Sequence, residues 1–147
     1  MKKTIIFMAV AILLGAISGK VLYTKYDDTK AVFNESNMAY FLQEGVYETE
    51  SSLMRNTKDI SPKLVINKKN KYYVYVGISR SLDGINKVKR IYKKKGYGVI
   101  LKQKEIKDDN YLINLDQYDI LLENATSTND ILTIQEVVLS NYEELIK

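Results

Sequence analysis

The chain has 147 residues and a mass of 16.9 kDa, enough for one folded domain with short additions at its ends. It contains no Cys and no His, which excludes disulfides, zinc sites built on Cys or His, and His-dependent catalytic triads. The formal charge of +4 is uneven: residues 38–106 carry fifteen basic and six acidic residues, and residues 107–147 carry two basic and nine acidic residues. A basic block of this kind favours an anionic partner, the acidic tail itself, or solubility alone.

The first expected element is a membrane-spanning helix over residues 1–23. Two lysines precede an apolar run that is interrupted only by Lys20 and continues to Tyr23. That length suits a hydrocarbon core of about 30 Å, and N-terminal lysines favour a cytoplasmic start. A cleaved signal peptide is the alternative, because residues 16–18 have the small-x-small form of a cleavage site. We expect a single-pass cell-membrane protein with its domain outside the cytoplasm, on a polar linker over residues 24–37.

Residues 38–106 predict strands and helices in the order β-α-β-β-α-β. Alternating side chains indicate strands, hydroxyl residues cap the helices, and a proline and a glycine end them. The expected elements are a strand at 39–47, a helix from a Thr49 or Ser51 cap to Ile60, a hairpin of strands at 64–66 and 72–78, a helix from a Ser79 or Ser81 cap to Gly96, and a strand at 99–106.

An internal repeat supports this order. A shift of 32 residues places Gly45 on Gly77 and Leu42 on Val74. Two βαβ halves in so short a chain predict an α+β, ferredoxin-like fold, with a four-stranded antiparallel sheet and both helices on one face. The other face of the sheet would then be open.

Strand parity indicates which side chains occupy the open face. The same parity directs Glu44 toward the core, where an unpaired carboxylate is costly unless a bulge near Gly45 frees it. The side chains expected on the open face are Phe41, Gln43, Tyr47, Tyr73 and Tyr75.

Three motifs in this order resemble the SPOR domain, the sporulation-related repeat of bacterial envelope proteins. They are Leu-Gln-Glu-Gly-Val-Tyr at 42–47, Tyr-Tyr-Val-Tyr-Val-Gly at 72–77 and Lys-Lys-Gly-Tyr at 94–97. The resemblance covers residues 38–106 and departs from the family pattern in Glu44, an unusual residue there, and in Tyr47, where the family has Phe. It implies a non-enzymatic module that binds peptidoglycan glycan strands stripped of stem peptides, in cell division or sporulation.

The residues themselves suit a sugar ligand. Flat aromatic rings cover the C–H faces of pyranoses, and an amide both donates to and accepts from their hydroxyls. Gln43, Tyr47, Tyr73 and Tyr75 are therefore the expected glycan-binding residues, although tyrosine is also common in strands for packing reasons alone. No metal or other cofactor is expected.

The second expected helix carries a basic run that ends in Lys93, Lys94 and Lys95. A solvated helix face is the simplest interpretation; the acidic tail, anionic wall polymers and lipid headgroups are the alternatives. Nucleic acid is not expected, because the chain lacks the aromatic RNA-binding motif and its topology points outward.

The acidic tail, residues 107–147, predicts two amphipathic helices, the second capped by Ser127. We expect the tail to pack on the helical side of the module, near Lys87 and Arg90, and to leave the tyrosine-bearing face free. Two functions compete with glycan binding. One is an adaptor that binds another envelope or division protein through the sheet or the acidic helices. The other is a wall hydrolase, for which the sequence shows no paired-carboxylate signature.

Overall fold

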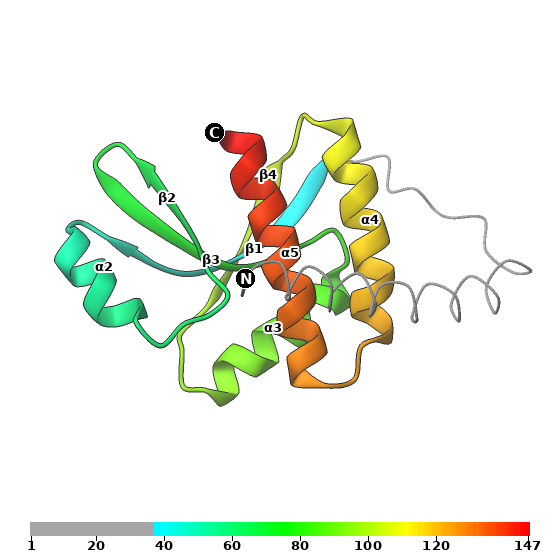
Figure 1. Cartoon of the computed structure of the whole chain (residues 1–147), viewed down its shortest axis with the longest axis horizontal. Coiled ribbons are helices and arrows are strands. Elements are labelled where there is room, and N and C mark those ends of the chain that lie inside the picture. Colours follow the sequence, from blue (N-terminus) through cyan, green and yellow to red (C-terminus); the bar gives the residue numbers. More distant parts are fainter. Residues whose placement is uncertain (1–36) are drawn as a thin grey trace, which may run out of the picture. The chain divides into compact units, whose positions relative to one another are not determined.

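Four antiparallel strands form a single sheet in the computed structural model, which describes residues 37–147 (Figure 1). The strand order is β2-β3-β1-β4. The expected α+β class and four-stranded antiparallel sheet are confirmed. The expected membrane helix lies outside the described residues, and within 37–147 no helix is long and apolar enough to cross a membrane. The strands are β1 (Met38–Tyr47), β2 (Leu64–Lys68), β3 (Lys71–Ser79) and β4 (Ile100–Glu105).

Each of the four described helices begins at a side-chain cap. The cap oxygen accepts a hydrogen bond from the backbone N–H three residues further on, which satisfies one of the free donors of the first turn. The caps are Thr49, Ser81, Asp108 and Ser127, of which the sequence indicates three outright or as one of two choices. The helices are α2 (Glu50–Thr57), α3 (Leu82–Lys94), α4 (Asp109–Asn124) and α5 (Thr128–Ile146).

The end of α3 confirms the expected left-handed glycine cap. Gly96 has φ +88° and its N–H donates to Lys93 O at 3.0 Å, while Tyr97 N–H donates to Tyr92 O at 3.0 Å. These two bonds form a Schellman motif, and the Tyr97 ring packs against Tyr92 with centroids 6.2 Å apart. The cap thus fixes the direction in which the chain enters β4.

Two irregularities interrupt the pairing of β1 with β3. Between Leu42 and Gln43 the partner strand carries an extra residue, Val76, and between Gln43 and Gly45 strand β1 itself carries an extra residue, Glu44. Each extra residue reverses the alternation of side chains between the two faces. A bulge is therefore present near Gly45, where one could free Glu44 from the core, and Glu44 is half-buried.

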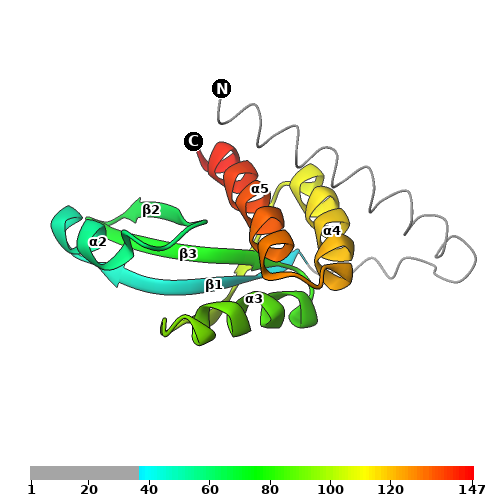
Figure 2. The ribbon, with the colours of Figure 1, turned by 60° about the horizontal axis from the view of Figure 1, so that its bottom comes forward.

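Helices cover both faces of the sheet. Figure 2 shows α3 below the strands and α4 and α5 above them. A Cβ placed on Gly77 would meet Val88 of α3 at 3.0 Å, whereas Phe41 packs on Tyr142 of α5 with ring centroids 5.1 Å apart. The tail packs on the module and reaches Lys87 of α3, as expected, but the expectation that it leaves the other face of the sheet free is wrong, because α5 covers part of that face.

The tail also completes one edge of the sheet. Strand β2 pairs with β3 only as far as Tyr75, so the outer edge of β3 is unpaired beyond that point. There the Ile78 N–H donates to Gln135 Oε1 at 2.8 Å and the Arg80 N–H donates to Asp119 Oδ2 at 2.7 Å. Side chains of α5 and α4 therefore replace the missing strand. Residues 37–147 accordingly form one compact unit with its own core.

Candidate functional site on the sheet

The sheet face opposite α3 presents two rows of side chains that run across the strands. Directly paired residues of antiparallel strands share a face, so the register assigns each row. The inner row consists of Leu64, Tyr75, Gln43 and Ile100, and the outer row of Ile66, Tyr73 and Val46.

The inner row is buried except at its β4 end. Tyr75 is 3% exposed and Gln43 is 7% exposed, whereas Ile100 is 54% exposed. The Tyr75 ring meets Phe41 edge-on, with centroids 5.6 Å apart, and Phe41 in turn contacts Tyr142 of α5. The expectation that Gln43 and Tyr75 are open to ligand is therefore wrong. Strand parity identifies the face correctly but carries no information on what the tail places over it.

A lysine of β4 contacts both rings of this aromatic pair. Lys104 Nζ donates to the Tyr75 hydroxyl and lies 4.0 Å from the centroid of that ring and 4.9 Å from the centroid of Phe41. Burial, followed by the charge of Lys68, lowers the pKa of Lys104, and burial raises the pKa of Tyr75 to about 12. The tyrosine therefore stays neutral at ordinary pH. Nothing in the sequence singles out Lys104, because only the β1–β4 register places it beside these rings.

The outer row is accessible. Val46 is 40% exposed, and Tyr73 and Ile66 are half-buried, so the edges of their side chains reach solvent. Together with Ile100 they form the open patch, defined here as Ile66, Tyr73, Val46 and Ile100. Of the four expected glycan-binding residues, Tyr73 is the one that this patch contains.

Tyr47 lies on the opposite face. It pairs with Tyr72, whereas its neighbour Val46 pairs with Tyr73, because the extra residue Glu44 has reversed the alternation. The Tyr47 hydroxyl donates to the Glu44 carboxylate at 2.9 and 3.1 Å. Burial and then this carboxylate raise the pKa of Tyr47 to about 12. The pair gives the carboxylate of Glu44 a partner and removes Tyr47 from the candidate site.

The open patch offers one phenol ring among three aliphatic side chains. A phenol ring flanked by aliphatic side chains can cover the C–H face of a sugar ring, and the Tyr73 hydroxyl can bond to a sugar hydroxyl. Lys68 and Lys102 share this face through the register and are exposed. Among residues 37–147 no group of carboxylates is placed to hold a metal ion.

Comparisons with family models, with curated proteins and with solved structures give no match for this chain.

Proposed function

We propose that the protein binds naked glycan strands of peptidoglycan at the cell envelope, in cell division or sporulation, without catalysing a reaction. The order β2-β3-β1-β4, with α2 and α3 as crossovers, is the arrangement of a ferredoxin-like sheet. It supports the resemblance of residues 38–106 to a SPOR domain. The predicted segment 1–23 would tether this domain to the outer surface of the cell membrane.

The observation that carries the proposal is the outer row of the sheet, in which Val46 is exposed and Tyr73 and Ile66 are half-buried. Ile66, Tyr73 and Val46 lie on three neighbouring strands, which at a strand spacing of ~4.8 Å span about 10 Å. A row of that length is comparable to two sugar rings of a glycan strand. A naked glycan carries little charge, so an apolar and aromatic row suits it better than a cluster of lysines.

The buried inner row takes a supporting role in this proposal. Tyr75 lies between Tyr73 and the rings of Phe41 and Tyr142, and the Lys104 ammonium group binds its hydroxyl. Gln43 pairs with Tyr75 and is buried. These contacts give the open patch a rigid base, which lowers the loss of conformational entropy on binding.

The test is binding of residues 37–147 to purified sacculi with and without their stem peptides. Tyr73→Ala should weaken binding to the peptide-free sacculi about fivefold or more, the effect of a lost aromatic contact of ~1 kcal/mol. Tyr72→Ala is the matched control, because Tyr72 is the adjacent half-buried tyrosine on the opposite face. Equal binding by both variants and the wild type would contradict the proposed site.

An adaptor function is the second candidate, and the outer surface of α4 favours it. Ile113 is 49% exposed and Ile120 is 44% exposed, and a spacing of seven residues places both on one side of the helix. An adaptor of this kind would ignore purified sacculi. Its binding to an envelope protein would depend on Ile113 and Ile120 and be indifferent to Tyr73→Ala.

A further inference from the structure

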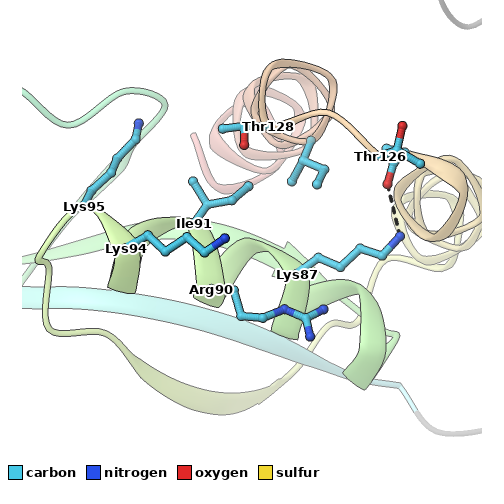
Figure 3. A pocket seen from close by; sticks show the side chains of 9 residues that line it. Lys87, Arg90, Ile91, Lys94, Lys95, Thr126 and Thr128 are labelled. Carbon is cyan, nitrogen blue, oxygen red and sulfur yellow. Dashed lines mark hydrogen bonds between the residues drawn. The ribbon is translucent and has the colours of Figure 1, made fainter.

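A pocket of about 500 Å³ lies between α3 and the connection from α4 to α5 (Figure 3). Its walls come from α3 and the C-cap of that helix, from the α4–α5 connection and from the start of α5, and it shares no residue with the open patch. Its lining residues are Lys87, Arg90, Ile91, Lys94, Lys95, Ala125, Thr126, Thr128 and Ile131.

Positive charge dominates this pocket. Four of the nine lining residues are lysine or arginine, and none is acidic. Lys87, Arg90 and Lys94 follow one another at helical spacing, so they share one side of α3, and Figure 3 shows their side chains along the same wall. A concave surface with charges of one sign concentrates the field and attracts counter-ions.

Only some of these basic side chains have partners within the protein. Lys87 Nζ donates to the carbonyl oxygens of Leu122, Glu123 and Ala125, and so it holds the end of α4. Arg90 and Lys94 are exposed, and within residues 37–147 neither forms an ion pair or a side-chain hydrogen bond. Two cations therefore face the pocket with their donors free.

The acidic tail does not neutralise the pocket, although the sequence allows that pairing. Asp116 pairs with Arg80 at 2.7 Å, Asp119 is buried beside the same residue, and Glu123 accepts a hydrogen bond from Ser81. These three carboxylates of α4 are thus used by the β3–α3 turn, and Asp130 at the start of α5 is not among the residues that line the pocket. The basic wall is left for an external anion.

We propose that this pocket binds a phosphate ester. Arg90 and Lys94 would contact the phosphate, since guanidinium and ammonium groups form charge-assisted hydrogen bonds to its oxygens. The hydroxyls of Thr126 and Thr128 add donors, and Ile91 and Ile131 offer an apolar floor for the organic part of the ligand. A soluble or polymeric polyol phosphate and a phospholipid headgroup share this chemistry.

The experiment measures binding of residues 37–147, which carry their own core. Glycerol phosphate in solution is the first probe and vesicles of phosphatidylglycerol are the second, each at low and at high salt. The variant is Arg90→Gln with Lys94→Gln. Its control is Lys58→Gln with Lys107→Gln, the same loss of charge at exposed lysines outside the pocket.

We expect saturable binding that the pocket variant weakens at least about tenfold and the control leaves within about twofold, the effect of losing charge-assisted hydrogen bonds. Binding of glycerol phosphate would identify a soluble or polymeric source, and binding to vesicles alone would identify a lipid headgroup. Absence of binding to both probes, or equal loss in both variants, would overturn the proposal. The readout is independent of Tyr73, so the glycan proposal stands or fails separately.

Discussion

At the scale of single residues, Asp119 stands out as a buried carboxyl group with a raised pKa. Its side chain is 7% exposed, and burial raises its pKa to about 6 in spite of the hydrogen bonds it accepts. Oδ2 accepts from the N–H groups of Arg80 and Ser81, and Oδ1 lies 2.6 Å from Ser79 Oγ. That hydroxyl also lies within hydrogen-bond distance of Ser81 O, and its one hydrogen cannot serve both oxygens. A proton on Oδ1 would resolve this conflict.

Asp119→Asn should therefore keep the fold and remove a pH dependence. The folded pKa of about 6 lies above the usual 3.8, so the folded state holds the proton more tightly and wild-type stability falls as pH rises from about 4 to 6. The decrease in the free energy of unfolding that Asp119 causes over this pH range is at most about 3 kcal/mol. The asparagine amide mimics the protonated acid, because its N–H group can donate to Ser79 Oγ while its oxygen accepts the backbone donors. Urea unfolding across this pH range measures the difference; parallel curves for both proteins would refute the assignment.

The face of the sheet on which each side chain lies is the feature of the candidate site that the sequence predicts least well. The sequence suggests a bulge near Gly45 only because parity directs the Glu44 carboxylate into the core, and it gives no sign of the second irregularity at Val76. Since one extra residue exchanges the two faces of a strand, Tyr47 changes sides. Parity is reliable only up to the first bulge, which is why Tyr73 joins the open patch and Tyr47 does not.

At the scale of elements, β3 depends on the tail for its hydrogen bonds. The Ile78 N–H is buried, and its acceptor is the side chain of Gln135, whose exposed fraction is zero. The other polar atom of that amide, Nε2, has no hydrogen-bond partner among the described residues. One good hydrogen bond and one unsatisfied donor therefore share a single side chain.

Gln135→Leu should destabilise the protein by about 1 kcal/mol, at the low end of the ~1–3 kcal/mol for an unsatisfied buried group. The change leaves the Ile78 N–H without an acceptor but also removes the unpaired Nε2. Glu136→Leu, one residue further on and exposed, is the control and should change the unfolding free energy little. Thermal and urea unfolding measure both, and an equal effect of the two substitutions would contradict the role assigned to Gln135.

The helix and strand limits follow closely from the sequence, because local chemistry determines them. Ser81 and Ser127 cap their helices, Gly96 ends α3 in a left-handed conformation, and the β2–β3 hairpin turns through Lys69 and Asn70 at positive φ. The docking of the tail does not follow. An apolar stripe shows that a helix buries one side, but it does not identify which of two sheet faces receives it.

At the scale of the whole molecule, the tail is part of the core. The nine apolar residues that α4 and α5 bury each contribute about 1.5–3 kcal/mol, so their summed contribution exceeds the ~5–15 kcal/mol of net stability of a domain. The buried apolar residues of α4 and α5 are Tyr111, Leu112, Leu115, Leu121, Leu122, Ile131, Ile134, Val138 and Leu139. From the sheet, Phe41 contacts Tyr142 of α5 and Tyr75 of β3, and the Ile78 N–H donates to Gln135 of α5.

Deletion of residues 110–147 should therefore abolish cooperative thermal unfolding rather than shift its midpoint. The uncovered sheet would bind a hydrophobic dye and self-associate, as dye fluorescence and sedimentation would show. A truncated chain that stays monomeric and melts at the temperature of residues 37–147 would show that the tail is an independent arm. Its acidic helices would then serve a partner and not the fold.

The most direct test of glycan binding is to map a denuded glycan fragment on isotope-labelled residues 37–147 by NMR. The proposed function predicts the largest shifts at Tyr73, Val46 and Ile66, with saturation at one site and no change at Ile113 on α4. Shifts confined to α4, or none at a concentration that saturates binding to sacculi, would contradict the account.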